Sequence, residues 1–298
     1  MIKTKGSDVM NISLIEKSNL HILGAGVPSI SVISDKERIP RRNFDAGKRP
    51  AITIRNLKKS FGDTPLYSNF NLDIPSGKFI SVFGPNGCGK STLINLIAGL
   101  MPIDGGEILF DGRNVKDVPI GYVFQNYRDA LFPWLKIIEN IEYPLIVRGI
   151  GKSERKRRVE ELIAQFDVKF DIYRRPYELS GGQQQLVSIL RALAPKPEVM
   201  FLDEPFSALD YEMTLFIRDK LQTIFTQTGM TMILVSHDLE DAVFLADHVL
   251  LLTKKPTQVA DIVDFNAGRP RTDATLVDQD FLFAKSKSLE IFKHEVQK

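Results

Sequence analysis

The chain has 298 residues, 43% of them hydrophobic, and a net charge of +2 from 39 basic and 37 acidic residues. This length can bury a hydrophobic core, and the balanced charge excludes a general electrostatic attraction to nucleic acid. The single cysteine excludes an intramolecular disulfide, and no apolar run reaches the ~18 residues that a membrane-spanning helix needs.

Residues 1–50 are predicted to form a poorly ordered extension outside the folded domain. They are rich in serine, glycine, asparagine and charge, and they end in the breaker sequence Lys48-Arg49-Pro50. The composition changes at Ala51–Leu57, where apolar and polar residues alternate as in a half-buried strand. We therefore expect a folded domain over residues 51–268.

A glycine-rich motif follows the next predicted strand. Residues 78–83 are mostly apolar and lead into Gly84-Pro85-Asn86-Gly87-Cys88-Gly89-Lys90-Ser91, after which Lys90–Leu100 has the spacing of a helix. Strand, glycine loop and helix are the context in which the pattern G-x-x-x-x-G-K-[ST] binds a nucleotide. Its backbone N–H groups can surround the β-phosphate, Lys90 can reach the β- and γ-phosphates, and the Ser91 hydroxyl can bind Mg²⁺.

The rest of the chain alternates between strand and helix patterns. Glycines bracketing Glu107–Phe110 predict an edge hairpin, and residues 127–175 are typical of helices. Apolar strands are predicted at 199–202, 232–235 and 249–252. This order predicts an α/β fold with a parallel sheet and a helical subdomain inserted at about 127–190. In the C-terminal tail, residues 269–298, the apolar residues Leu289, Phe292 and Val296 indicate an amphipathic helix.

Polar residues stand at the ends of two later strands. Asp203 and Glu204 end one strand, where the carboxylates point into the crevice in which α/β sheets bind ligands. We expect Asp203 to hold Mg²⁺ and Glu204 to polarise the attacking water, although an acid here can also cap the helix after Pro205. His237 ends the second strand and is predicted to contact the γ-phosphate and hold the water in line; the alternative is a structural histidine.

Two further residues have expected roles at this site. Gln125 ends the strand Gly121–Phe124, and we expect it to complete the shell of Mg²⁺ and the attacking water. Phe61 precedes the glycine loop and can stack on adenine, but the sequence leaves packing in the core equally open.

A second anion site is indicated by Leu179-Ser180-Gly181-Gly182-Gln183. A Ser-Gly-Gly turn at the head of a helix exposes free backbone N–H groups at the positive end of the helix dipole. It carries no lysine and no partner carboxylate. One nucleotide cannot easily occupy both loops of a compact monomer, so the two loops are expected to meet across a dimer.

In this order, the motifs resemble the nucleotide-binding subunits of ABC transporters, over roughly Ile52 to Asp264. The resemblance implies a P-loop NTPase core with a parallel sheet, an antiparallel β subdomain and an inserted helical subdomain that carries the signature motif. It implies a head-to-tail dimer that holds ATP and Mg²⁺ between the glycine loop of one subunit and Ser180 of the other. The residues expected to bind the nucleotide are Phe61, Gly84, Pro85, Asn86, Gly87, Cys88, Gly89, Lys90, Ser91, Thr92, Ser180, Gly181, Gly182, Gln183 and Asp210; those expected to hold the metal are Ser91, Gln125 and Asp203; and those expected to act in catalysis are Glu204, His237 and Gln125.

A narrower similarity lies in residues 122–135, which look like the importers of nitrate, sulfonates, taurine and bicarbonate. Residues 203–210 and Arg269-Pro270-Arg271 fit importers in general. In that group the segment after Gln125 forms the groove for a helix of the membrane permease. Trp134 is then an exposed aromatic anchor, while the alternative is that it fills the helical subdomain. The chain departs from the family at Leu186, where an arginine is usual.

The resemblance implies an ATPase subunit that couples dimer closure to the uptake of a small anion. The expected partners are a second ATPase subunit, an integral membrane permease and, indirectly, an extracytoplasmic substrate-binding protein, with no nucleic acid. The expected location is the cytoplasmic face of the cell membrane. The alternative is a soluble ABC ATPase that is not coupled to transport, although such proteins usually carry two cassettes, long coiled coils or zinc insertions.

Overall fold

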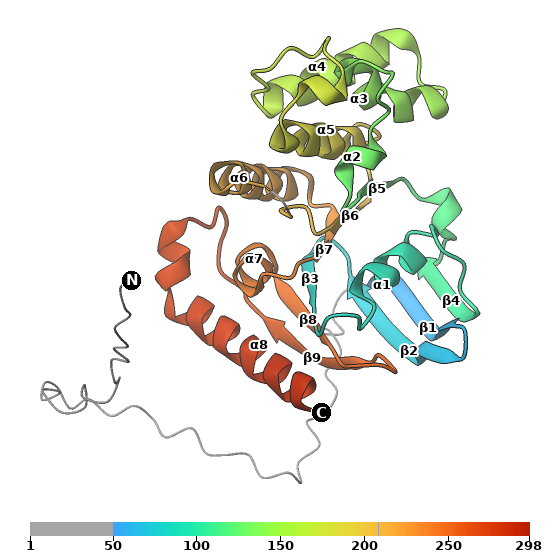
Figure 1. The fold of residues 1–298 in the computed structure, drawn as a ribbon, viewed down its shortest axis with the longest axis vertical. Coiled ribbons are helices and arrows are strands. Elements are labelled where there is room, and N and C mark those ends of the chain that lie inside the picture. Colours follow the sequence, from blue (N-terminus) through green and yellow to red (C-terminus); the bar gives the residue numbers. More distant parts are fainter. Residues whose placement is uncertain (1–49, 208) are drawn as a thin grey trace, which may run out of the picture. The chain divides into compact units, whose positions relative to one another are not determined.

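The computed structural model describes residues 50–207 and 209–298, and the predicted N-terminal extension lies outside them. These residues form two sheets and the helices that cover them (Figure 1). The strands are β1 Pro50–Phe61, β2 Thr64–Pro75, β3 Phe79–Phe83, β4 Gly105–Phe110, β5 Ile120–Val123, β6 Val199–Asp203, β7 Thr231–Val235, β8 His248–Leu252 and β9 Val259–Asp264. The helices are α1 Lys90–Ile97, α2 Tyr127–Ala130, α3 Ile137–Val147, α4 Lys152–Gln165, α5 Gly181–Leu193, α6 Tyr211–Thr228, α7 Leu239–Leu245 and α8 Gln279–Gln297.

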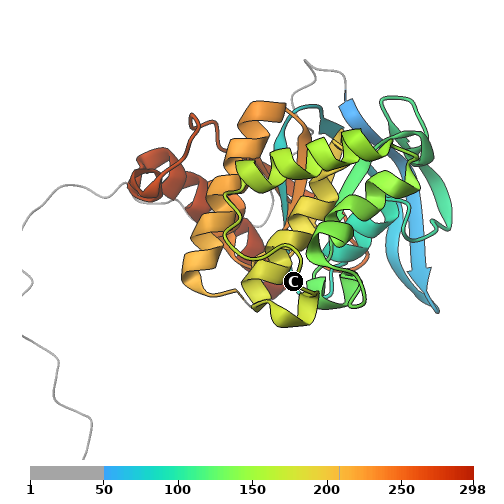
Figure 2. The same ribbon diagram turned by 90° about the horizontal axis from the view of Figure 1, so that it is seen from above.

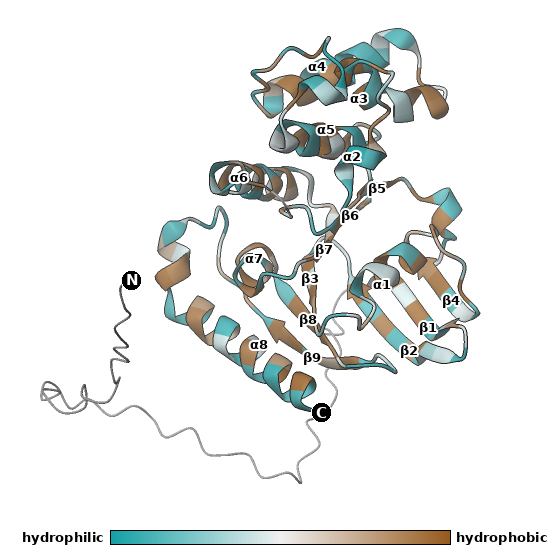
Figure 3. Ribbon diagram, in the orientation of Figure 1, coloured by the Kyte–Doolittle hydropathy of each residue, from teal (hydrophilic) through white to brown (hydrophobic). Residues whose placement is uncertain are grey.

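The larger sheet has six strands in the order β5-β6-β7-β3-β8-β9. Its first five strands are parallel, and β9 pairs antiparallel with β8. Strands β3, β6 and β7 are buried along their whole length, as expected of parallel strands covered on both faces. Alternate residues of β6 enter different cores: Met200 and Leu202 enter one, and Val199 and Phe201 enter the other. In Figure 3 these strands are largely brown.

Different layers cover the two faces of this sheet (Figure 1). Helices α6, α7 and α8 contribute buried residues to the core on one face. Helix α1 and a three-stranded antiparallel sheet, in the order β2-β1-β4, contribute to the core on the other face. Helices α2 to α5 lie at the β5 end of the sheet, as both ribbon views show (Figures 1 and 2). The predicted fold class, with its parallel sheet, antiparallel β subdomain and helical subdomain, is confirmed.

The segment 107–110 lies in β4, at the edge of the small sheet, and pairs with β1. After it the chain turns back at Asp111-Gly112, so that Phe110 and Arg113 form a short antiparallel bridge, as the flanking glycines predict. Two details differ from the sequence-based expectations. Helix α1 ends at Ile97 rather than at Leu100, whose side chain is exposed. Strand β9 was not predicted; it lies at the edge of the sheet and follows the turn after β8.

The C-terminal helix was predicted, but only part of the predicted apolar stripe is buried. Leu289 and Val296 are 38% and 43% exposed, whereas Phe281 is 1% exposed and packs edge-to-face on Phe265. Phe292 does pack inward, with its ring 5.1 Å from that of Phe83 in β3. Helix α8 has apolar residues on two sides, and only the side that packs against β8 and β9 is buried.

Candidate active site

The glycine loop connects β3 to α1 at the carboxyl edge of the parallel sheet. Gly87 and Gly89 have φ angles of +74° and +98°, a backbone region that favours glycine. A Cβ at Gly89 would also lie 2.9 Å from Leu66, so a side chain cannot fit there. The Lys90 ammonium donates hydrogen bonds to the Gly84 carbonyl at 2.9 Å and the Pro85 carbonyl at 3.3 Å, which closes the loop on itself.

Cys88 can offer only its backbone to a ligand in this loop. Its side chain is 1% exposed and belongs to the core beneath the small sheet. Burial raises the pKa of the Cys88 thiol, although the neighbouring Lys90 opposes the shift. The thiol is therefore turned away from the loop and is poorly reactive.

The Ser91 hydroxyl donates a 2.8 Å hydrogen bond to Oδ1 of Asp203. Ser91 lies in the first turn of α1 and Asp203 is the last residue of β6, so the strand end brings the carboxylate to the loop. Burial raises the pKa of Asp203, and the hydrogen bond from Ser91 opposes this. A hydroxyl beside a carboxylate is an oxygen donor set that fits Mg²⁺.

Glu204 lies between Gln125 and His237. The Gln125 amide donates a 2.8 Å hydrogen bond to Glu204 Oε2, and His237 Nδ1 lies 3.5 Å from the same oxygen. Glu204 has a φ of +47°, and its backbone N–H is held by the Val235 carbonyl at 2.9 Å. A non-glycine residue in this conformation stores strain of the kind that clusters at functional sites.

The alternative interpretation of Glu204 as a helix cap is wrong. The next helix, α6, begins at Tyr211, and its cap is Asp210, whose carboxylate accepts the Met213 N–H at 2.8 Å. Asp210, expected to bind nucleotide, therefore caps a helix within its own chain.

A cavity of about 410 Å³ opens over the glycine loop. It is lined by Phe61, Leu66, Asn86, Gly87, Gly89, Lys90, Ser91, Thr92, Glu204 and Lys255. Phe61 is 52% exposed, so the alternative that it packs in the core is wrong. Lys255 was not predicted; it lies three residues beyond β8, and its place after the carboxyl end of a strand, like that of Glu204 and His237, is the signal that indicates it.

The signature turn does not line this cavity. Ser180 caps α5: its hydroxyl accepts the Gln183 N–H at 3.3 Å, and the Gln183 side chain accepts the Ser180 N–H at 3.0 Å. A Cβ at Gly181 would lie 2.6 Å from the Tyr127 hydroxyl, and one at Gly182 would lie 2.7 Å from Met213 Cγ. Within one chain, the structure therefore does not bring Ser180 to the glycine loop.

Leu186 lies behind the signature turn, where the resembling family has an arginine. It is 3% exposed and belongs to the core that α5 shares with the sheet. An apolar side chain fits this position and needs no counter-ion.

Exposed aromatic residues lie on the helical subdomain. Trp134 is 69% exposed, so the alternative that it fills this subdomain is wrong. Its ring lies 5.5 Å from that of Phe132, which is also 4.7 Å from that of Tyr143. A second cavity, of about 520 Å³, is lined by Asn95, Leu100, Met101, Tyr122, Phe124, Gln125, Asn126, Asp129, Ala130 and Asp203.

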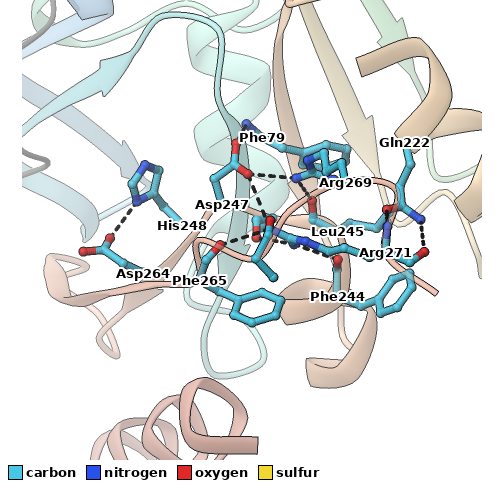
Figure 4. A network of polar contacts seen from close by, with 12 residues as sticks. Phe79, Gln222, Phe244, Leu245, Asp247, His248, Asp264, Phe265, Arg269 and Arg271 are labelled. Atoms are coloured by element: carbon cyan, nitrogen blue, oxygen red, sulfur yellow. Dashed lines mark hydrogen bonds and ion pairs between the residues drawn. The ribbon is translucent and has the colours of Figure 1, made fainter. Parts of the chain in front are cut away.

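A polar network anchors α7, the helix that follows His237 (Figure 4). The buried Arg271 guanidinium donates to the carbonyls of Phe244 at 2.8 Å and Ala246 at 2.7 Å, at the C-terminus of α7. Asp247 accepts from Arg269 at 2.9 Å and from the Phe79 N–H at 3.0 Å. The segment 269–271 thus joins the end of α7 to the start of β3.

Among the described residues, no helix is long and apolar enough to cross a membrane.

Comparisons with known proteins agree with this geometry. A family model described as ABC transporter matches residues 67–207. Over 211 residues, 69% of this chain, the sequence is 41% identical to the spermidine/putrescine import ATP-binding protein PotA of Haemophilus influenzae. It is 43% identical over 206 residues to an sn-glycerol-3-phosphate import ATP-binding protein of Rhizobium johnstonii, and 41% identical over 213 residues to the sulfate/thiosulfate import ATP-binding protein of Neisseria meningitidis. The matches cover 67% and 68% of this chain.

These matches span 55% to 58% of the relatives' own length. A solved structure is matched over its whole length: the dimeric structure of a bacterial ABC transporter cassette, with a TM-score of 0.65 and 31% identity over 73% of this chain. A dimeric structure of the same cassette in a post-hydrolysis state, bound to ADP and phosphate, gives the same values.

Proposed function

This chain belongs to the ABC transporter family, and from that premise we propose that it is the ATP-binding and ATP-hydrolysing subunit of an importer. The observation that carries the proposal is the meeting of Glu204 with Gln125 and His237 beside the Ser91–Asp203 pair. Phosphate-binding, metal-binding and water-activating groups converge there at one edge of the sheet.

The residues divide the work of hydrolysis. The glycine loop and Lys90 bind the phosphate chain of ATP, and Phe61 stacks on the adenine. Ser91 and Asp203 hold Mg²⁺, which neutralises charge on the phosphates when it is bound. Glu204 accepts the proton of the attacking water, while Gln125 and His237 hold the Glu204 carboxylate in place.

The signature turn acts on the nucleotide of a second subunit. In one chain Ser180 lies outside the cavity of the glycine loop, and its helix N-terminus is suited to an anion. A head-to-tail homodimer supplies that anion as the γ-phosphate on the opposite glycine loop. The dimeric relative supports this arrangement.

The exposed Trp134, with the half-buried Phe132 beside it, is the docking site for an integral membrane permease. Aromatic side chains with large exposed faces are the usual anchors of protein interfaces. Trp134 is such a side chain. The same segment of the chain begins at Gln125, which lines the second cavity and donates a hydrogen bond to Glu204. Docking there places the protein at the cytoplasmic face of the membrane and links the permease to the hydrolytic site.

For the transported substrate, we propose a small anion of the nitrate, sulfonate, taurine and bicarbonate group. The support is the similarity of residues 122–135 to importers of that group. The relatives described above import spermidine and putrescine, glycerol phosphate, or sulfate and thiosulfate. Uptake of radiolabelled taurine, nitrate, bicarbonate and spermidine into cells that express the whole transporter tests this choice, and uptake of spermidine alone would contradict it.

The experiment for the main proposal is ATP hydrolysis by the purified chain, alone and with its permease in lipid nanodiscs. We expect hydrolysis that depends on Mg²⁺, is lost in Lys90→Ala, and rises when the permease is present. Trp134→Ala should abolish the rise but keep the basal rate, and Phe283→Ala, an equally exposed aromatic on α8, should change neither. An ATP hydrolysis rate that does not change when the permease is added would favour the alternative of a soluble ABC ATPase.

A further inference from the structure

The connection between β8 and β9, residues 253–258, lies against the glycine loop. Strand β8 runs parallel to β3 in the sheet, so both carboxyl ends emerge side by side. A Cβ at Gly84, the first residue of the loop, would meet the Leu252 carbonyl at 3.0 Å. On its other side the connection is held by β2, where the Leu66 carbonyl accepts the Thr257 N–H at 2.7 Å.

Two buried hydroxyls bind consecutive carbonyls of the glycine loop. The Thr257 hydroxyl donates a 2.6 Å hydrogen bond to the Cys88 carbonyl, and the Tyr67 hydroxyl donates a 2.9 Å bond to the Gly89 carbonyl. Thr257 is 0% exposed and Tyr67 is 1% exposed, so these bonds are shielded from water.

These bonds orient the loop amides. In a trans peptide the C=O and the following N–H point in opposite directions. A Cys88 carbonyl held by Thr257 turns the Gly89 N–H away from the core. The Gly89 carbonyl is held by Tyr67 and by the Leu93 N–H at 2.8 Å, which fixes the peptide that leads into Lys90. Gly89 and Lys90 both line the cavity over the loop, where a phosphate would lie.

The same connection supplies a cation to this cavity. Lys255 is exposed and lines the cavity together with Phe61 and the glycine loop. Its neighbour Lys254 points elsewhere, since its ammonium donates to the Val296 carbonyl at the end of α8. A lysine ammonium beside a phosphate-binding loop matches the charge of a nucleotide phosphate chain.

We propose that the β8–β9 connection is part of the nucleotide site: Thr257 and Tyr67 are positioning residues for the loop amides, and Lys255 binds the phosphate chain. This inference rests on the proposed function, because it requires that the cavity take a nucleotide. The nucleotide site then has a second side, formed by a segment more than 160 residues after the glycine loop in the chain.

The test measures dissociation constants of the full chain by calorimetry, with ATP, AMP and adenosine as probes. Thr257→Val should weaken ATP binding about tenfold, since it leaves the buried Cys88 carbonyl without its hydroxyl partner. Tyr67→Phe should weaken it about threefold, because the Gly89 carbonyl keeps its 2.8 Å bond from the Leu93 N–H. Thr257→Ser, which keeps the hydroxyl, should restore the affinity. Thr231→Val is the matched control, because that buried hydroxyl accepts the Gly77 N–H at the opposite end of the sheet. It should lower the melting temperature as Thr257→Val does, with no change in ATP affinity.

Lys255→Gln should weaken ATP binding about fivefold, with a loss that shrinks at high salt, and should leave adenosine binding unchanged. Lys254→Gln is its control and should bind both as the wild type does. The positioning role is overturned if Thr257→Val and Tyr67→Phe bind ATP with wild-type affinity. The role of Lys255 is overturned if its variant loses ATP and adenosine equally, or neither. If the wild type itself binds no ATP and matches Lys90→Ala, the proposed function fails instead.

Discussion

The side-chain amide of Gln125 donates a 2.8 Å hydrogen bond to the carboxylate of Glu204. Gln125 follows β5 and Glu204 follows β6, and His237, 3.5 Å from the same carboxylate oxygen, follows β7. These three strands are neighbours in the sheet, so their carboxyl ends place the three side chains together. Gln125 lies two residues before α2, so this hydrogen bond joins Glu204 to the start of the helical subdomain.

Glu204→Gln should bind ATP but hydrolyse it about 10² to 10⁴-fold more slowly, because the change removes the base and leaves the phosphate-binding groups intact. The variant should accumulate as an ATP-bound dimer, seen as a doubled mass in light scattering. Glu240→Gln, which removes an exposed carboxylate paired with Lys285, serves as the control. Wild-type turnover in Glu204→Gln would remove Glu204 from the mechanism.

Gly181→Ala should disrupt the signature turn, because its Cβ would lie 2.6 Å from the Tyr127 hydroxyl. That hydroxyl is buried and has no hydrogen-bond partner among the described residues, so Tyr127→Phe should cost little stability. The nearest remaining atom of that ring would be Cζ, at 3.8 Å. We therefore expect Tyr127→Phe to rescue both the melting temperature and the ATPase rate of Gly181→Ala. A double variant no better than Gly181→Ala alone would contradict this.

The stability of the fold should depend on Asp241 between pH 4 and 6. Burial raises the pKa of Asp241 from 3.8 to about 6, while Arg218, 3.2 Å away, opposes the shift. Because the folded state binds this proton more tightly than the unfolded chain does, this group's contribution to the unfolding free energy falls as pH rises through this range. Above pH 6 it stays constant.

Urea unfolding of Asp241→Asn at pH 4.5 to 7.5 checks this. Relative to wild type, the variant should lack the fall in unfolding free energy over the acidic half of that range. Asp219→Asn, at an exposed position on α6, should keep the wild-type slope. Parallel curves for wild type and Asp241→Asn would contradict the prediction.

Arg271→Lys should lower the unfolding free energy by roughly 3 kcal/mol, since a lysine cannot reproduce the planar fork that reaches several carbonyls. The side chain is fully buried, and its guanidinium also donates to the Phe265 carbonyl at 3.0 Å. Arg269→Lys should cost less, because among the described residues Arg269 donates hydrogen bonds to one carbonyl, that of Leu245, and to the Asp247 carboxylate. A lysine can also keep part of its contact with the Phe225 ring. Chemical denaturation measures the unfolding free energy of both variants. Equal losses of unfolding free energy would show that the Arg271 guanidinium contributes no more than that of Arg269.

The sequence alone predicts the strand–loop–helix motif and the strand ends that carry Asp203, Glu204 and His237. Those patterns are local: an apolar run of strand length, a glycine loop, and the polar residue that follows. The parallel sheet then aligns the strand ends without further information.

Contacts between residues that lie far apart along the chain are visible only in the tertiary structure. Periodicity shows which residues are apolar but not which face a neighbour covers, so Leu289 and Val296 of α8 are exposed while Phe281 is buried. Periodicity also does not show which strands pair with each other, so the pairing of β4 with β1 was not predicted. The contact of Thr257 with the Cys88 carbonyl joins residues 169 positions apart. Only the packing of β8 beside β3 brings them together, because such a contact leaves no periodic pattern in the chain.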